Sequence, residues 1–234
     1  MKKARITVLL MAAGRGTRMG SKQNKVFFTI GNKPVIVITI QNLMSTLTTL
    51  RVSFHFIIVI HPDDKSFMDD LFKRWNIPLK KITFVVGGDD RQTSVFFGLN
   101  AIHHEDTVVL IHDAARPFIE VGFIASCIKM VMKTGAACVG VPVKDTIKQV
   151  DHDHVIVDTP PREMLWQVQT PQAFSIDIIK KAHEKANEDG FRGTDDAVLV
   201  ERLGIPVQMV MGSYRNIKIT TPEDLTYAEV LLGE

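Results

Sequence analysis

Residues 9–20 read LLMAAGRGTRMG, an apolar stretch that runs directly into a loop with several glycines and two arginines. A backbone that wraps a triphosphate needs small residues, so that its amides can approach the phosphates, and it needs cations that neutralise them. The small residues are Ala12, Ala13, Gly14 and Gly16, and the cations are Arg15 and Arg18. This combination favours a nucleotide-triphosphate loop, with a plain strand-to-helix turn as the alternative.

Neither of the two standard glycine loops matches this segment. A Walker A loop needs Gly-Lys followed by Ser or Thr, and the dinucleotide fingerprint needs a third glycine where Met19 stands. The continuation adds a further cation, because Lys25 follows within the run NKVF at residues 24–27. The sequence therefore indicates phosphate binding by a loop of another kind.

Apolar runs of the length and β-branched content typical of buried strands alternate with stretches that have helical spacing. The predicted strands are residues 6–11, 54–60, 82–86, 108–111, 136–141 and 207–211. The predicted helices are residues 35–47, 65–75, 92–102 and 121–132. This alternation predicts an α/β fold with a doubly wound, mostly parallel sheet.

Three loops are expected to converge on one crevice of this sheet. Ligands of doubly wound sheets bind beyond the carboxyl ends of the strands. The glycine loop follows the first predicted strand, Gly87 and Gly88 follow the third, and His112 and Asp113 close the fourth.

Short motifs recur in order along nearly the whole chain. They are AAGRGTRMG at 12–20, NKVF at 24–27, GGDDRQTSV at 87–95, HDAARP at 112–117, VKDT at 143–146, REMLWQVQTPQ at 162–172, GTDDA at 193–197 and NIKIT at 216–220. Together they resemble the motifs of the sugar-phosphate nucleotidylyltransferases and, among these, of the 2-C-methyl-D-erythritol 4-phosphate cytidylyltransferase family of the non-mevalonate isoprenoid pathway. The resemblance implies a Rossmann-like nucleotidyltransferase fold and transfer of CMP from CTP to methylerythritol phosphate, with release of pyrophosphate.

The resemblance also implies roles for charged residues. Arg18 and Lys25 would stabilise the pentavalent phosphoryl centre, and Arg162 and Lys218 would position the attacking phosphate. Because that nucleophile is already an anion, catalysis rests on alignment and charge stabilisation rather than on a side-chain base. Asp113 would hold Mg²⁺, or another divalent cation, that bridges the phosphates.

The remaining site residues follow from the same resemblance. The family's nucleotide-contacting positions correspond to Ala12, Ala13, Gly14, Gly16, Gly88, Asp89, Ser94 and Ala114. Further substrate contacts correspond to Arg116, Thr146 and Thr170.

Residues 143–172 break the alternation of strands and helices. Short β-like pieces at 146–150 and 155–158 flank an acidic and histidine-rich turn, and so small a sheet cannot fold alone. The resemblance implies a protruding β-arm that joins two subunits of a homodimer and brings Thr146 and Arg162 to the neighbour's active site. A plain surface hairpin is the alternative, and the chain otherwise reads as one domain over residues 1–234.

Several residues keep an alternative reading. Asp113 could cap a helix ahead of Ala114, Lys218 could lie on a solvated strand face, and Asp195 and Asp196 could simply begin a helix. Arg215, where the family often has an acid, could alter substrate contacts or point outward. For the whole chain, the alternatives are a ribitol-5-phosphate cytidylyltransferase of cell-wall polymer synthesis and a non-catalytic nucleotide-binding protein.

The composition suits a single globular enzyme of 234 residues. A net charge of +2, without a basic stripe, argues against nucleic acid as a partner. Cys127 and Cys138 lack metal-ligand spacing and are expected to be buried thiols, which together with the absence of a membrane-length apolar run predicts a cytoplasmic protein. Residues 1–13 imitate a secretory signal, but cleavage there would destroy the loop, so we expect a first buried strand.

Overall fold

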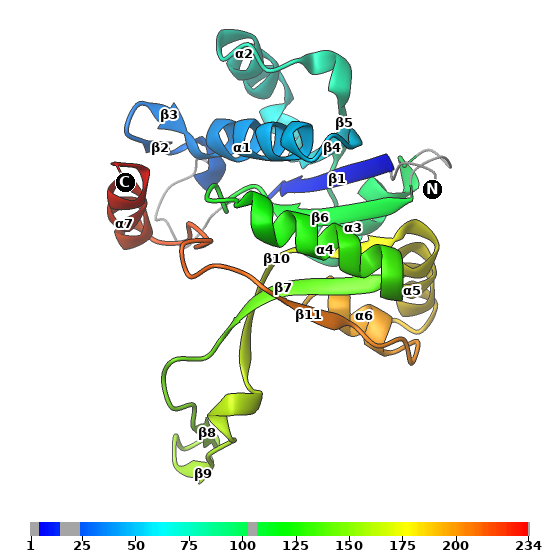
Figure 1. Ribbon diagram of the computed structural model, residues 1–234, viewed down its shortest axis with the longest axis vertical. Coiled ribbons are helices and arrows are strands. Elements are labelled where there is room, and N and C mark those ends of the chain that lie inside the picture. The colour runs from blue at the N-terminus through cyan, green and yellow to red at the C-terminus, as the bar shows by residue number, and fades with distance from the viewer. Residues whose placement is uncertain (1–4, 15–23, 103–106, 234) are drawn as a thin grey trace.

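A seven-stranded sheet forms the centre of the computed structural model, which describes residues 5–14, 24–102 and 107–233 (Figure 1). Its strands are β1 (Arg5–Ala12), β4 (Ser53–Ile60), β5 (Ile82–Val86), β6 (Val108–Asp113), β7 (Ala136–Pro142), β10 (Trp166–Ser175) and β11 (Gln208–Met211). Their order is β11-β7-β10-β6-β1-β4-β5. Strand β10 pairs antiparallel with both β6 and β7, whereas the other neighbours are parallel, so the predicted α/β fold with a mostly parallel sheet is confirmed.

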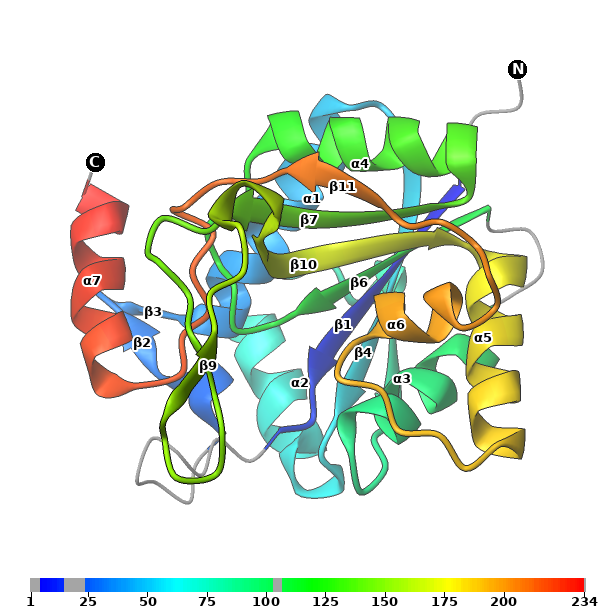
Figure 2. The same ribbon diagram turned by 90° about the horizontal axis from the view of Figure 1, so that it is seen from below.

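Helices cover both faces of the sheet (Figure 2). One face packs against α1 (Val35–Thr49), α2 (Lys65–Arg74) and α4 (Val121–Thr134). The other face packs against α3 (Arg91–Asn100), α5 (Ile176–Glu188) and α6 (Asp196–Glu201). The C-terminal helix α7 (Pro222–Gly233) lies beside a small hairpin of β2 (Thr29–Ile30) and β3 (Lys33–Pro34).

Strand β1 shows why an apolar run in this sequence predicts a strand of the sheet. Ile6, Val8 and Leu10 belong to the apolar cluster on one face, and Leu9 belongs to the cluster on the other. All four are fully buried, as expected for a central strand of a parallel sheet. The N-terminal apolar run is therefore a core strand, as predicted.

The alternating pattern did not predict β10, α5 or α6. Strand β10 contains Gln167, Gln169, Thr170, Pro171 and Gln172, and polar residues with a proline argue against an inner strand. In the fold, this polar run pairs irregularly with β7, with a register shift between Val168 and Gln172. Its side chains find partners only after the chain has folded.

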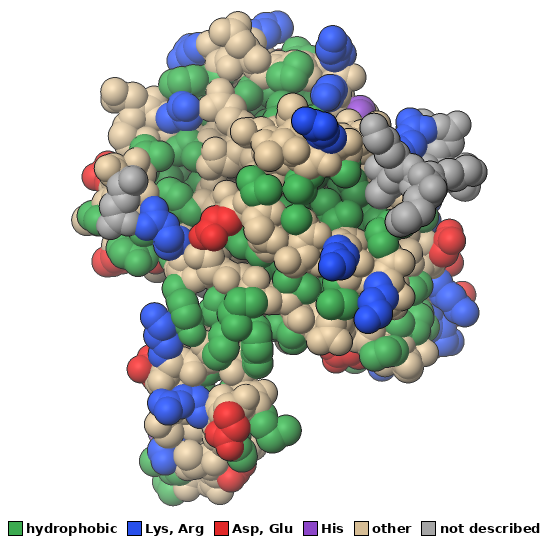
Figure 3. All heavy atoms as spheres, viewed as in Figure 1, with side chains coloured by type: hydrophobic (Ala, Val, Ile, Leu, Met, Phe, Trp, Pro, Cys, Tyr) green, Lys and Arg blue, Asp and Glu red, His purple; other side chains and the backbone are tan. Residues whose placement is uncertain are grey.

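Between β7 and β10 the chain leaves the body as a protruding arm, visible in Figures 1 and 3. The predicted short strands are present as β8 (Gln149–Val150) and β9 (Ile156–Asp158), which pair antiparallel. Hydrophobic side chains gather where the arm leaves the body (Figure 3). Val155, Ile156 and Val157 are each more than half exposed, so this arm exposes apolar surface that the single chain does not cover.

Both cysteines are free and buried, as expected, Cys127 in α4 and Cys138 in β7. Burial raises the pKa of Cys127 to about 12, so this thiol stays protonated at neutral pH. Among the described residues, no helix has the length and apolarity to cross a bilayer.

Candidate active site

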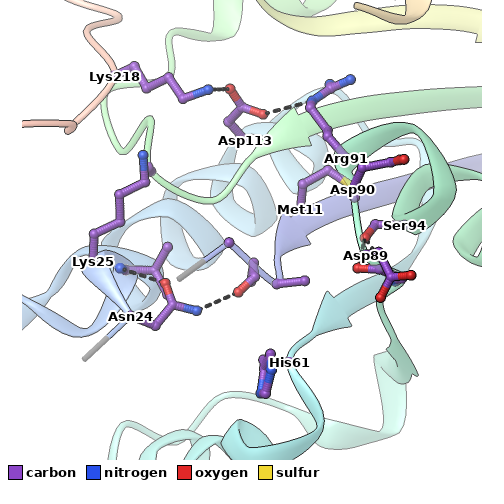
Figure 4. A pocket seen from close by; sticks show the side chains of 16 residues that line it. Met11, Asn24, Lys25, His61, Asp89, Asp90, Arg91, Ser94, Asp113 and Lys218 are labelled. Carbon is purple, nitrogen blue, oxygen red and sulfur yellow. Dashed lines mark hydrogen bonds and ion pairs between the residues drawn. The ribbon is translucent and has the colours of Figure 1, made fainter. Parts of the chain in front are cut away.

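The loops after β1, β5 and β6 open into one cavity of about 530 Å³ (Figure 4). Its lining includes Ala12, Ala13, Gly14, Gly88, Asp89 and Ser94, six of the residues predicted to contact a nucleotide. The expected convergence of three loops at the carboxyl edge of the sheet is therefore confirmed. Gly16 and Arg18 lie outside the described residues, and Ala114 is fully buried next to Ala115, which forms the wall.

The loops after β1 and β5 pack too closely for a side chain at Gly87. A Cβ built there would lie 2.7 Å from Cβ of Ala13 and 2.9 Å from Oγ of Ser94. Ser94 fixes the next residue, because its hydroxyl accepts a hydrogen bond from the amide of Gly88 at 3.0 Å. The small residues of the GGDDR motif thus let the backbone of one loop approach the other.

Lys25 is aimed at the same cavity by Asn24 (Figure 4). The side-chain amide of Asn24 donates to the carbonyl of Ala12 at 2.6 Å and to a carboxylate oxygen of Asp64 at 3.0 Å. Its oxygen accepts from the amide of Val26, which caps the 3₁₀ turn Lys25–Phe27. This buried amide therefore ties the turn that carries the cation to the end of β1.

Asp113 is the last residue of β6, and its side chain meets three cations, of which Arg116 is the most distant, with Nε 4.0 Å from Oδ2. Nζ of Lys218 lies 2.6 Å from Oδ2, and Nε of Arg91 lies 3.7 Å from Oδ1. Burial by itself would raise the pKa of Asp113, but Lys218 and Arg91 outweigh burial and hold the pKa well below its usual range. The alternative of a helix cap is wrong, because a turn and no helix follows Asp113.

Lys218 points away from the two isoleucines beside it, as their alternation predicts. Ile219 is fully buried in a small cluster with Ile30 and Val35, and Ile217 packs against that cluster. The amide of Ile219 donates to the carbonyl of Ala115 at 2.8 Å, which fixes this segment beside the loop after β6. Lys218 therefore lines the cavity, and a merely solvated position is excluded.

A second hollow of about 390 Å³ adjoins the first, and the two share Arg91, Asp113 and Lys218. Its lining contains Arg116 and Thr170, both predicted to assist substrate binding. The guanidinium of Arg116 donates to the carbonyl of Asn216 at 2.7 Å, while its Nε has no hydrogen-bond partner among the described residues. The second hollow thus offers a buried donor beside the shared carboxylate.

His112 connects Thr170 and Arg116, because each of its ring nitrogens forms a hydrogen bond with one of these residues. Nε2 of His112 lies 3.0 Å from the carbonyl of Arg116, so it carries the proton, and Nδ1 accepts from the hydroxyl of Thr170 at 3.1 Å. The same hydroxyl oxygen accepts from the amide of Asp113. Burial lowers the pKa of His112 to about 4, so the ring is neutral at physiological pH.

Thr146 and Arg162 are not brought to this site within one chain. Both are exposed on the arm, and neither is among the residues that line the two hollows. A guanidinium nitrogen of Arg162 donates to the carbonyl of Lys144 at 2.9 Å, within the arm itself.

Asp113 suits a hard divalent cation as a single carboxylate ligand. Mg²⁺ is commonly bound by one or two carboxylates together with substrate phosphates and water. The described residues contain no group of three or more His, Cys, Asp or Glu side chains that could hold a metal. The donor set fits an ion that arrives with a nucleotide better than it fits a preformed metal centre.

Sequence reasoning gave no role to some residues of this site. Arg91 stood inside a recognised motif and His61 in no motif, yet both line the cavity (Figure 4). The signal for Arg91 was its place after two acids at a strand end. Arg215, in contrast, reaches the carbonyl of Leu231 in α7 at 3.1 Å.

Comparisons with known proteins agree over almost the whole length. The sequence profile of the 2-C-methyl-D-erythritol 4-phosphate cytidylyltransferases matches residues 6–234. Relatives of that name from Caldanaerobacter subterraneus subsp. tengcongensis and Halalkalibacterium halodurans are 44% and 46% identical; the alignments cover 97% of this chain in both cases, and 98% and 97% of the relatives. The solved 4-diphosphocytidyl-2C-methyl-D-erythritol synthase of Anaerococcus prevotii is 32% identical, with a TM-score of 0.84 over 99% of both chains.

Proposed function

Because this chain belongs to the 2-C-methyl-D-erythritol 4-phosphate cytidylyltransferase family, we propose that its larger cavity holds CTP and that the adjoining hollow holds the acceptor phosphate. The protein is a cytidylyltransferase of isoprenoid precursor biosynthesis. It transfers CMP from CTP to 2-C-methyl-D-erythritol 4-phosphate, and the products are 4-diphosphocytidyl-2-C-methyl-D-erythritol and pyrophosphate. The names of the relatives favour this acceptor over ribitol phosphate, and an enzyme over a non-catalytic binder.

One observation supports this placement of the substrates more than any other. The two hollows meet at Arg91, Asp113 and Lys218, and nowhere else do their linings coincide among the described residues. In the reaction, an acceptor phosphate oxygen attacks the α-phosphorus, so the two anions must meet at one point. A junction with two cations beside one carboxylate suits that meeting point.

Charge stabilisation in this arrangement comes from lysines and arginines. Lys25 projects into the larger cavity from the turn held by Asn24, where it can contact phosphate oxygens whose charge grows in the transition state. Lys218 stands at the junction, where it can hold the acceptor phosphate. Arg18 belongs to the same proposed set by family resemblance and lies outside the described residues.

A divalent cation is part of the proposal. Asp113 would hold this ion, which would supply positive charge that neutralises part of the charge of the phosphates. The carboxylate is held ionised by Lys218 and Arg91, so it is available as a ligand at neutral pH. Lys218 would then pass from the carboxylate to the incoming phosphate.

The arm belongs to the proposal as a dimer contact. Thr146 and Arg162 are displayed on it, away from the hollows that their predicted roles require. In a homodimer, the arm of one subunit would bring these side chains to the acceptor hollow of the other and would cover the exposed Val155, Ile156 and Val157. The proposal places this enzyme in the cytoplasm.

Pyrophosphate release with defined substrates tests the proposal. The protein is incubated with Mg²⁺, with CTP or UTP, and with methylerythritol phosphate or ribitol phosphate as the acceptor. We expect release only when CTP and methylerythritol phosphate are both present, because a site that hydrogen-bonds the exocyclic amine of cytosine rejects a base that lacks it. Equal turnover of CTP and UTP, or faster turnover with ribitol phosphate, would overturn the substrate assignment.

A site variant completes this test. Lys218→Gln removes the ammonium at the junction but keeps a polar side chain of similar length, and we expect turnover to fall sharply. Lys181→Gln, at an exposed position of α5, is the matched control and should keep wild-type turnover. Wild-type activity of the Lys218 variant would separate the reaction from this cavity.

A further inference from the structure

A row of charged groups leads from the reaction centre into the second helical layer. Beyond Lys218 and Asp113, the guanidinium of Arg91 reaches Asp196, with Nη1 2.7 Å from Oδ2. The other oxygen of Asp196 lies 3.2 Å from Nε2 of His183 on α5. Opposite charges alternate from Lys218 to Asp196, and Figure 4 shows Lys218 and Arg91 on opposite sides of Asp113.

Asp196 does not provide the N-terminal cap of helix α6. The residue before it, Asp195, caps the helix by accepting a hydrogen bond from the amide of Val198 at 3.0 Å. Asp196 is 1% exposed, and a buried carboxylate is costly unless charged partners surround it. The fold therefore holds a buried charge whose main partner is an arginine of the reaction centre.

The place of Asp196 relative to the sheet is fixed by Gln172 of β10. The side-chain oxygen of Gln172 accepts hydrogen bonds from the amides of both Asp196 and Ala197, each at 3.0 Å. Gln172 is itself 1% exposed and lies opposite Ile111 in β6, two residues before Asp113. Gln172 thus sets the carboxylate of Asp196 at a defined distance from the end of β6.

We propose that Asp196 is a positioning residue for the cytidylyl transfer: it holds the guanidinium of Arg91 at the junction of the two hollows, where Arg91 contacts the phosphates that meet there. This inference rests on the proposed placement of CTP and the acceptor. Arginine is a long side chain with many rotamers, and a third of the Arg91 side chain is exposed, so it needs an anchor to stay in place. Asp196 supplies the anchor from the buried side, and Asp113 supplies a second contact from the site.

A double-mutant cycle tests the inference. Asp196→Asn keeps the size of the side chain but removes its charge, and Arg91→Lys keeps a cation that cannot reach Asp196 and Asp113 together. We expect Asp196→Asn to lower kcat by about 10²-fold, the size of effect that follows a displacement of about 1 Å at a reacting centre. CTP binding, measured at equilibrium without the acceptor, should weaken much less than kcat falls.

The coupling between the two residues distinguishes positioning from a structural role. If Asp196 acts through Arg91, the double variant should be no slower than Arg91→Lys alone, because a lysine that cannot reach Asp196 and Asp113 together no longer connects the anchor to the junction. Independent, multiplicative losses would show that Asp196 acts in another way and would overturn the inference. So would wild-type kcat in Asp196→Asn, whatever the change in its melting temperature.

Asp189→Asn is the matched control. Asp189 also pairs with an arginine, since its Oδ2 accepts from Arg202 at 3.1 Å, but this pair is exposed at the C-terminal ends of α5 and α6. We expect the variant to keep wild-type kcat. A loss as large as that of Asp196→Asn would mean that any Asp–Arg pair in this layer matters, which contradicts a specific role.

A second pair of variants, in which both partners of the Arg91–Asp196 ion pair are neutral, keeps the test available if Asp196→Asn does not fold. If Asp196→Asn alone does not fold, the pair Arg91→Gln with Asp196→Asn leaves no unpaired charge. Its kcat should equal that of Arg91→Gln alone; a much lower kcat would overturn the inference. The wild-type assay with CTP and methylerythritol phosphate decides the proposed function separately.

Discussion

At the scale of single residues, the site depends on cations that face phosphate-sized hollows, and Lys25 is the clearest of them. Its turn is held by the buried amide of Asn24, so the ammonium is placed before any substrate arrives. Lys25→Ala should reduce kcat by a factor on the order of a hundred to a thousand, about 2.7–4 kcal/mol, as when one preorganised donor is removed. Turnover and CTP binding, measured separately, check this.

The Lys25 experiment has a conservative variant and a control. Lys25→Arg should recover part of the activity, since a planar guanidinium replaces a compact point charge. Lys33→Ala, which loses a surface contact to Gln41, should behave as wild type. If Lys25→Ala kept its kcat and only weakened CTP binding, the lysine would be a ground-state binder.

His112 makes stability depend on pH. Its pKa falls from 6.5 to about 4 on folding because the ring is buried, so the unfolded chain binds a proton that the folded one refuses. The free energy of unfolding should therefore fall as pH drops from about 6.5 towards 4, by up to about 3 kcal/mol from this residue. Urea titrations across this range should show a weaker pH dependence for His112→Gln.

The control for this experiment is Cys127→Ala. It removes another buried side chain, but burial raises the pKa of Cys127 to about 12, so this thiol does not titrate between pH 4 and 6.5. The whole stability curve should move down without a change in slope. An unchanged slope for His112→Gln would contradict the assignment of the pH dependence to His112.

At the scale of elements, the start of α7 is stabilised by Asp224, an acid in its first turn. One carboxylate oxygen of Asp224 accepts hydrogen bonds from the amides of Thr220 and Thr221 and from the hydroxyl of Thr220. Asp224→Ala should lower the free energy of unfolding by about 1 kcal/mol, the usual cost of a lost cap. Thermal unfolding and amide exchange in α7 measure this loss.

Glu229→Ala is the control on the same helix, because Glu229 is an exposed acid away from the first turn. It should leave the stability near that of the wild type. Equal losses in the two variants would mean that helix propensity or overall charge, and not the cap, explains the effect.

At the scale of the whole molecule, the proposed active site is shared between two subunits. Mixing inactive Arg162→Ala with inactive Lys25→Ala subunits should restore activity, because each mixed dimer contains one site with both groups intact. At equal mixing, about a quarter of the wild-type activity is expected. Pyrophosphate release by the mixture, after exchange of subunits, measures the rescue.

A second mixture serves as the control for the shared site. Lys25 and Lys218 line the same cavity of one chain. A mixture of Lys25→Ala and Lys218→Ala subunits therefore contains no dimer in which one site has both lysines. This mixture should therefore stay as inactive as either variant alone, because every site in it lacks one of the two lysines. Rescue in this second mixture, or no rescue in the first mixture although mixed dimers have formed, would count against the exchange of Arg162 through the arm.

The sequence by itself determined the class of the fold and much of the larger cavity. Apolar runs such as those in β1 and β4 are buried on both faces, a local property that periodicity reports directly. Loops that follow parallel strands must meet at one edge of the sheet, so the order of motifs along the chain is enough to group the glycine loop, Gly88 and Asp113. Motif resemblance added the chemistry.

Only the tertiary structure decided how polar residues are used. The polar run of β10 argues against a strand, yet Gln172 is buried there because it binds the start of α6. Arg91 and Asp196 are far apart in the chain, and no local pattern predicts that they pair. Apolar burial can be read from neighbours in sequence, whereas hydrogen bonds and ion pairs form between groups that only the completed packing brings together.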